Sequence, residues 1–167
     1  MNFEIRPISE MPVRGYQGRR SPFRDALRAL KSGKAVFVPA NGTISGTNRD
    51  LTAVSSAWHV VEMLETNATV RGLTLQGGRR GVNGLADSAR IADCVMAGNT
   101  NGLAQMSQRT WLDNCVLTNN ANNGVHVYFG GSGGMGLTAR NCLVARNGAE
   151  GFYVERDNGG SNPFYVY

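Results

Sequence analysis

The fold is decided by a hexapeptide that recurs along the chain. It reads VRGLTL at residues 70–75, IADCVM at 91–96, LDNCVL at 112–117 and ARNCLV at 139–144. The fourth position of each copy is held in turn by Leu73, Cys94, Cys115 and Cys142, at intervals of 21, 21 and 27 residues. The last interval is longer because it contains the glycine-rich insertion GGSGGMG at 130–136. A fixed period of this size predicts a solenoid of stacked coils.

Other positions of the repeat carry turn residues. The position before the fourth is glycine, aspartate or asparagine, in the order Gly72, Asp93, Asn114 and Asn141. Five residues after the fourth position stand Gly78, Asn99, Asn120 and Asn147. A glycine then precedes an apolar residue at Gly84, Gly102, Gly124 and Gly151. Glycine and asparagine accept the positive φ of tight corners, so each coil is predicted to be short strands joined by turns.

This pattern predicts an all-β, right-handed parallel β-helix in which equivalent residues stack. The expected interior rows are Val70, Ile91, Leu112 and Ala139, and Leu75, Met96, Leu117 and Val144. In-register stacking keeps Cβ atoms too far apart for a disulfide, so the cysteines are expected to pack as small apolar residues. No Cys-x-x-Cys pattern is present, and Asp93 and Asp113 are 20 residues apart and so do not stack as a calcium pair. We expect no metal and no cofactor.

The sequence resembles the pectate-lyase-like superfamily in two places. One is SPFRDALRALKSGKAVFVPANGTI at 21–44, which is similar to that family's capping helix and first strand, and the other is NATVRGLTL at 67–75. The resemblance implies a β-helix that binds or processes polysaccharides. Within one domain, the expected parts are a basic arm at 1–20, a capping helix at 21–34, coils at 35–160 and a C-terminal tail at 161–167.

The positive charge is concentrated at the N-terminus. Residues 1–34 contain eight basic and three acidic residues, which accounts for the whole net charge of +5. The arm, with Arg14, Arg19 and Arg20, is expected to dock the chain to other virion or assembly proteins, and nucleic acid is a possible partner only through this arm. A plain solubilising leader is the alternative. The sequence has no apolar run that could span a membrane and no secretory signal, so we expect a location in a virion, or in the cytoplasm before assembly.

The candidate site comes from residues that follow the coil glycines. Alternation along the strands predicts two outward columns, one of Ala86, Ala104, His126 and Tyr153 and one of Ser88, Met106, Tyr128 and Glu155. In the last two coils these columns form an expected carbohydrate-binding patch of His126, Tyr128, Tyr153 and Glu155, with Arg156 and Asp157 at its edge. Aromatic rings beside polar groups suit sugars, which have an apolar face and many hydroxyls.

The residues of this patch are also candidates for catalysis. A lyase or epimerase needs a base and an acid, which His126 and either Tyr128 or Tyr153 would supply, and a hydrolase needs a carboxylate pair, for which Glu155 and Asp157 are the candidates on the patch. Arg79 and Arg80 lie in an expected turn, where they would clamp an acidic sugar or be solvated.

The leading hypothesis is a virion-associated, homotrimeric β-helix, similar to phage spikes, that binds cell-surface polysaccharide. A polysaccharide lyase, epimerase or hydrolase and a purely structural appendage are the alternatives.

Overall fold

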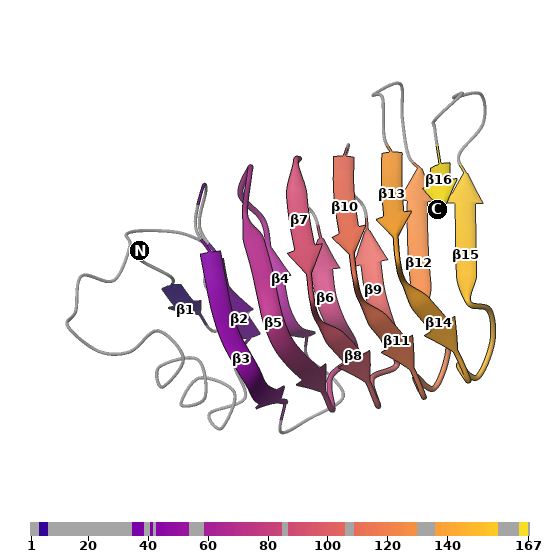
Figure 1. The fold of residues 1–167 in the computed structure, drawn as a ribbon, viewed down its shortest axis with the longest axis horizontal. Coiled ribbons are helices and arrows are strands. Elements are labelled where there is room, and N and C mark those ends of the chain that lie inside the picture. Colours follow the sequence, from indigo (N-terminus) through magenta and orange to yellow (C-terminus); the bar gives the residue numbers. More distant parts are fainter. Residues whose placement is uncertain are drawn as a thin grey trace.

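The computed structural model describes residues 4–6, 35–38, 41, 43–53, 59–84, 87–105, 109–129, 136–156 and 164–166. Every regular element in these ranges is a β-strand, and the strands stack coil upon coil along one axis (Figure 1). The predicted capping helix lies outside the described residues, as do Arg14, Arg19 and Arg20 of the predicted arm. In the part of the chain that is described, no helix is long and apolar enough to cross a membrane.

Two sheets make up the solenoid. The first contains, in order, β1 (Glu4–Arg6), β2 (Ala35–Phe37), β4 (His59–Met63), β6 (Arg80–Gly84), β9 (Asn101–Gln105), β12 (Val125–Phe129) and β15 (Phe152–Arg156). The second contains β14 (Leu143–Ala145), β11 (Val116–Thr118), β8 (Val95–Ala97), β5 (Thr69–Gln76), β7 (Ala89–Ala92), β10 (Arg109–Asp113), β13 (Gly136–Arg140) and β16 (Phe164–Val166), with β3 (Thr43–Thr52) beside β5. Among the strands that the structure describes, all pairs are parallel except β1 with β2. The predicted parallel β-helix is therefore confirmed.

A sharp corner divides the second sheet within each coil. The chain bends at the position before the cysteine, where Asp93, Asn114 and Asn141 have φ of 54°, 54° and 51°, and β5 passes the same position at Gly72 with φ of 68°. Asparagine and aspartate tolerate this left-handed conformation better than other side chains. The corner side chains also bond to each other, because Asn114 Nδ2 donates to Asp93 Oδ1 at 3.0 Å and Asn141 Nδ2 donates to Asn114 Oδ1 at 3.3 Å.

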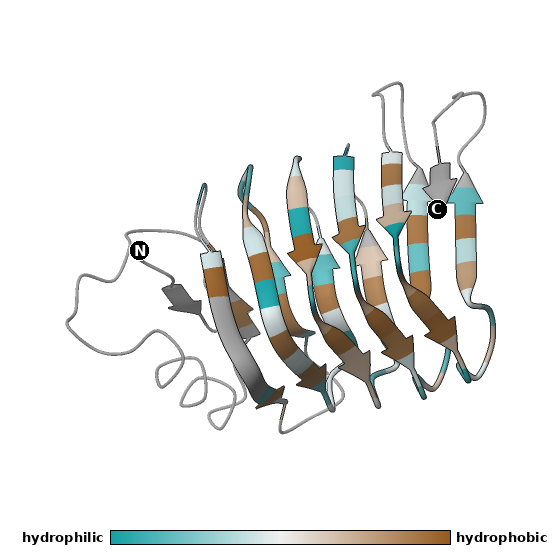
Figure 2. Ribbon diagram, viewed as in Figure 1, coloured by the Kyte–Doolittle hydropathy of each residue, from teal (hydrophilic) through white to brown (hydrophobic). Residues whose placement is uncertain are grey.

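The interior rows are those that the repeat predicts. Val70 pairs with Ile91, Ile91 with Leu112 and Leu112 with Ala139, and all four are fully buried. Figure 2 shows hydrophobic residues recurring along successive strands of the stack. In the second row Leu75, Met96 and Leu117 are buried, whereas Val144 of the last coil is half-buried. Stacking of equivalent apolar residues provides one continuous core.

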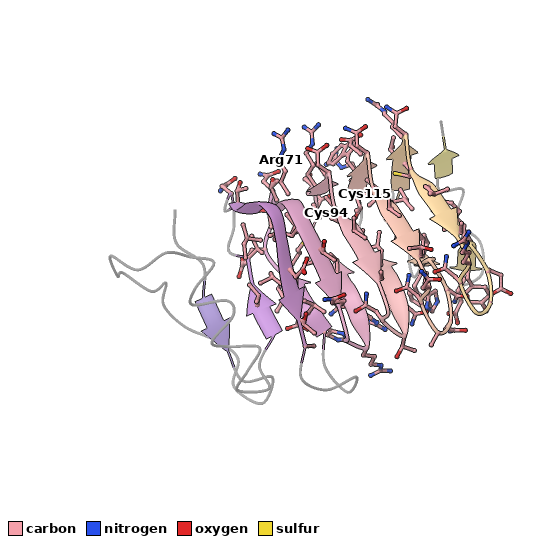
Figure 3. The ribbon with its side chains drawn as sticks, turned by 60° about the horizontal axis from the view of Figure 1, so that its bottom comes forward. Arg71, Cys94 and Cys115 are labelled. Atoms are coloured by element: carbon pink, nitrogen blue, oxygen red, sulfur yellow. The ribbon has the colours of Figure 1, made fainter. Side chains whose placement is uncertain are left out.

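The three cysteines are free, as the stacking argument predicts. Cys94 and Cys115 are buried and Cys142 is half-buried. Each thiol lies close to a backbone carbonyl two residues earlier, for example Cys115 Sγ at 3.2 Å from the oxygen of Asp113. Figure 3 labels Cys94 and Cys115 within the stack and Arg71 on its surface. The cysteines therefore act as packing residues of the corner.

An asparagine ladder follows β8, β11 and β14, buried at Asn99 and Asn120 and half-buried at Asn147. Asn99 Oδ1 accepts from the amide of Gly78 at 3.0 Å, Asn120 Oδ1 from the amide of Asn99 at 3.1 Å, and Asn147 Oδ1 from the amide of Asn120 at 3.1 Å. The ladder leaves no space for a side chain at the facing glycine. A Cβ on Gly102 would lie 2.6 Å from the oxygen of Gly124 and 3.0 Å from Asn120 Nδ2.

The structure corrects the predicted register in the first glycine position. Val82 pairs with Leu103, so the residue equivalent to Gly102 is Gly81, and the prediction of Gly84 was wrong. The reason is close packing against the next coil and the ladder. A Cβ on Gly81 would lie 2.7 Å from the oxygen of Gly102 and 3.1 Å from Asn99 Nδ2, whereas one on Gly84 would have only an ordinary contact at 3.7 Å. Ala86 and Ser88 therefore do not belong to the predicted outward columns. Ala86 and Met106 lie outside the described residues.

The last coil is the least covered. Val154 follows the buried Val127 in register but is 37% exposed, and Leu143 is 58% exposed. The strand β16 from the predicted tail pairs in parallel with β13 of the same chain. The tail thus extends the second sheet by one strand.

Candidate functional site

One column of aligned side chains crosses the first sheet from β4 to β15. The strand register aligns Glu62 with Asn83, Asn83 with Ala104, Ala104 with His126 and His126 with Tyr153. The neighbours of His126 along β12, Val125 and Val127, are fully buried, so the alternation of the strand directs His126 outward. Adjacent strands lie about 4.8 Å apart, so the column spans about 19 Å from Glu62 to Tyr153.

The aromatic patch, defined as His126, Tyr128, Tyr153 and Glu155, occupies one end of this column. His126 Nε2 lies 3.1 Å from Glu155 Oε2. The rings of His126 and Tyr153 have centroids 5.0 Å apart and are tilted by 57°. Tyr128 is aligned with Glu155 and is half-buried, while the Tyr153 side of the patch is open to solvent, with Tyr153 39% exposed. Four side chains predicted to share a surface therefore lie on two adjacent strands.

Two further predicted members are not placed by the structure. Arg156 belongs to β15, where its backbone is aligned with Phe129, but the structure does not describe its side chain. Asp157 lies outside them altogether. The patch therefore has one described carboxylate, that of Glu155, and the carboxylate pair expected of a hydrolase stays a prediction.

A polar cluster that the sequence reading missed occupies the other end of the column. It consists of His59 and Glu62 on β4 and Arg80 and Asn83 on β6. Asn83 Nδ2 donates to Glu62 Oε1 at 3.2 Å, Arg80 Nη1 donates to Asn83 Oδ1 at 2.6 Å, and His59 Nε2 lies 3.8 Å from Glu62 Oε1. The side chains of His59 and Glu62 are only 14% and 18% exposed.

Burial shifts the pKa values of His59 and Glu62 in this cluster. Loss of solvent, together with the guanidinium groups of Arg80 and Arg79, lowers the pKa of His59 to about 4. Burial raises the pKa of Glu62 above its usual value, although the Asn83 hydrogen bond and Arg80 oppose the rise. In the described part of the chain, His59 Nδ1 and Arg80 Nε are buried polar atoms with no hydrogen-bond partner. Perturbed protonation and unsatisfied polar atoms are typical of functional sites.

The interval of the repeat was the signal that could have revealed this cluster. Glu62, Asn83 and Ala104 are each 21 residues apart, the same period as the cysteines. The mistaken glycine register placed Ala86 in the column instead of Asn83. Arg79 and Arg80, expected in a turn, also separate: Arg79 is exposed, while Arg80 begins β6 and is half-buried in the cluster.

The described carboxylates and cysteines do not form a metal centre. Among the described residues, no three histidine, cysteine, aspartate or glutamate side chains are grouped so that they could hold a metal ion. Asp93, near the corner, accepts hydrogen bonds from Asn114 Nδ2 and from Arg71 Nε, and these bonds lower its pKa. Asp113 pairs with Arg90 at 3.0 Å.

Comparison with known proteins agrees with this architecture. A family model described as "right handed beta helix region" matches residues 32–164. The match includes every described strand except β1 and the end of β16. Neither a curated protein nor a solved structure matches the chain.

Proposed function

Because the chain belongs to the right-handed β-helix family, we propose that it binds a polysaccharide on the outer face of its first sheet. The observation that carries this proposal is the grouping of His126, Tyr153 and Glu155, with rings 5.0 Å apart and a carboxylate 3.1 Å from the imidazole. An exposed ring contacts the apolar face of a sugar, and the adjoining imidazole and carboxylate bond to hydroxyls. The strands hold these groups in place, so little conformational entropy is lost on binding.

The column of the first sheet is most accessible at one of its ends. A polysaccharide that crosses the strands would meet Tyr153 and His126 about 4.8 Å apart, whereas the next two members of the column, Ala104 and Asn83, are only 2% and 3% exposed. The accessible part of the column therefore lies at the aromatic patch, and this is where the first contact with a saccharide is expected.

The binding test uses a panel of acidic and neutral capsular polysaccharides and titration calorimetry. Tyr153→Ala and His126→Ala should each weaken binding by about tenfold or more, since an aromatic anchor of an interface contributes about 2 kcal/mol. Thr118→Ala, an outward substitution on β11 of the other sheet, is the matched control and should bind like the wild type. Equal affinity of all four proteins would place the ligand elsewhere.

A second candidate function is acid–base catalysis on the same polysaccharide. It is favoured by the polar cluster, where burial keeps His59 neutral and raises the pKa of Glu62, whose side chain is 18% exposed. A lyase, epimerase or hydrolase needs such groups beside the bound sugar. The test is to look for new reducing or unsaturated ends in polysaccharides that bind. Glu62→Gln should abolish product while leaving affinity within about twofold, and binding without product in the wild type would refute catalysis.

We further propose that the protein is displayed on a virion or a phage-derived particle as a homotrimer. The support is the excess of positive charge at residues 1–34 and the family's stacked-coil architecture. Basic segments dock to acidic protein surfaces, so Arg14, Arg19 and Arg20 would provide attachment. Light scattering of the purified chain tests the trimer, and exchanging the three arginines for glutamate should abolish co-sedimentation with particles. A monomer at high concentration would refute the trimer.

A further inference from the structure

A second polar surface lies on the second sheet, away from the aromatic patch. A pocket of about 420 Å³ opens over β7, β10 and β13, and its walls include Arg90, Trp111, Asp113 and Arg140. The register places Arg90 beside Trp111 on adjoining strands, and Asp113 beside Arg140. These four residues and the polar side chains around them are called the Trp111 pocket below.

Trp111 faces outward because of the strand on which it stands. Its neighbours along β10, Thr110 and Leu112, are 1% and 0% exposed and occupy the interior, so the indole must point the other way. The ring remains half-exposed. Exposure of a large aromatic ring costs hydrophobic free energy, so a partly exposed tryptophan in a pocket is a typical contact for a ligand with an apolar face.

Three arginines of the second-sheet strands β5, β7 and β10 are paired with aspartates, and one of these pairs, Arg90 with Asp113, lines the pocket. Arg90 Nη2 lies 3.0 Å from Asp113 Oδ2, Arg109 Nη2 lies 3.4 Å from Asp87 Oδ2, and Arg71 Nε lies 2.8 Å from Asp93 Oδ2. Figure 3 shows Arg71 among the nitrogen-tipped side chains at this surface. Each of these three guanidinium groups, although 61–66% exposed, therefore has a carboxylate partner that offsets part of its charge.

Arg140 differs from the other three arginines. Among the described residues no carboxylate lies within 4.0 Å of its guanidinium, and like Arg90 it is exposed and lines the pocket. A guanidinium binds a carboxylate through two parallel hydrogen bonds, so Arg140 is available for one anionic group of a ligand. Asn67, Thr69 and Ser88 line the same pocket and supply side-chain amide and hydroxyl groups for hydrogen bonds.

We propose that the Trp111 pocket binds a uronic acid residue of an acidic saccharide. The sugar ring stacks on the indole, its carboxylate bonds to Arg140, and its hydroxyls bond to Asp113 and the other polar side chains of the pocket. Nucleic acid fits less well, because binding to phosphates needs a clear excess of positive charge and three of the four arginines are already paired with aspartates. The pocket lies on a different sheet from His126 and Tyr153, so it is a second site, independent of the one proposed above.

The experiment titrates the full chain with tetragalacturonate and with the same oligomer after its carboxylates are reduced to alcohols. Binding is followed by calorimetry and by tryptophan fluorescence, with Trp111→Phe defining the signal of Trp58, the other tryptophan. The wild type should bind the acidic oligomer at least about tenfold more tightly than the reduced one. Trp111→Ala and Arg140→Gln should each lose about tenfold in affinity or more, whereas Arg146→Gln, which removes an exposed arginine outside the pocket, should lose nothing.

The outcomes separate this site from the aromatic patch. His126→Ala and Tyr153→Ala should leave the fluorescence response to tetragalacturonate unchanged, even if they abolish binding of a longer polysaccharide. The proposal is overturned if the two oligomers bind equally, if neither binds at the highest soluble concentration, or if Arg140→Gln binds the acidic oligomer as the wild type does. A response to a phosphate polymer but not to the uronate would also overturn it. Circular dichroism of each variant shows that the fold is retained.

Discussion

Substitution of Asn120 by alanine should be among the most damaging single changes in this chain. Asn120 is 2% exposed and stands in the middle of the asparagine ladder. Its Oδ1 accepts from the amide of Asn99 at 3.1 Å and from Asn99 Nδ2 at 3.3 Å. Its Nδ2 donates to the carbonyl of Met96 at 3.1 Å and to Asn147 Oδ1 at 2.9 Å. One side chain therefore links three coils.

The cost can be worked out from the partners that remain. After the change, Asn99 Nδ2 still bonds to Leu75 and Ala97, and Asn147 Oδ1 still accepts from the Asn120 amide. The amide of Asn99 and the carbonyl of Met96 each lose a buried hydrogen bond. A buried polar group left without its partner costs about 1–3 kcal/mol, so we expect a loss of about 2–6 kcal/mol in the free energy of unfolding. Typical domains have only about 5–15 kcal/mol in total.

Urea unfolding followed by circular dichroism measures this loss. Asn122→Ala is the matched control, because Asn122 is exposed and carries no side-chain hydrogen bond among the described residues, and its change should stay within about 0.5 kcal/mol. Asn147→Ala should fall between the two, since Asn147 is half-buried and water can replace part of its bonding. A loss of less than about 1 kcal/mol for Asn120→Ala would refute the view that the ladder holds the coils together.

Three other outcomes follow from the same geometry. Gly102→Ala should be strongly destabilising because its Cβ would lie 2.6 Å from a backbone oxygen. The nearest atom to a Cβ on Gly84 is 3.7 Å away, so Gly84→Ala should keep nearly wild-type stability. Equal losses of the two variants in thermal unfolding would contradict this. An alkylating thiol reagent should modify half-buried Cys142 first and leave Cys115 protected, and mass spectrometry of digested protein decides this. The pKa of His59 falls from 6.5 to about 4 on folding, so between these pH values the unfolded state binds an extra proton. The free energy of unfolding should therefore decline as pH falls through this window. The decline should be smaller in His59→Gln, and identical pH profiles of unfolding for the two proteins would contradict the assignment.

The fold was readable from the sequence because the solenoid repeats its chemistry as well as its period. The positions of Asn114 and Asn120 are set by corners that need positive φ or a buried amide, and few residue types can satisfy either need. The same constraint repeats in each coil, so several weak signals agree. The predicted rows of apolar residues were confirmed for this reason, although Val144 of the last coil is half-buried, and so was the prediction that the cysteines form no disulfide.

The candidate site was only partly readable, and the reason is local. His126 and Tyr153 were aligned correctly because each stands two residues after an unambiguous coil glycine. In the earlier coil, Gly81 and Gly84 compete for the same role. The choice depends on close approach to the Gly102 oxygen and the Asn99 side chain in space, which spacing alone does not reveal. The wrong choice hid Asn83, and with it the polar cluster around Glu62. The partial burial of His59 depends on tertiary packing, for which the sequence offers no local pattern.

The Trp111 pocket was hidden for a different reason, although its period is as regular as that of the cysteines. Thr69, Arg90, Trp111 and Thr138 follow one another at intervals of 21, 21 and 27 residues, and each stands four positions before the fourth residue of the hexapeptide. Outward positions are chemically varied because no corner or core constrains them, so no repeated residue type marks the column.

The same freedom has a measurable consequence: Trp111→Ala and His126→Ala should each change the free energy of unfolding by less than about 1 kcal/mol, far below the effect expected for Asn120→Ala. If either outward substitution destabilised the chain as much as Asn120→Ala does, its side chain would be part of the scaffold, and loss of ligand binding in that variant would no longer identify a site.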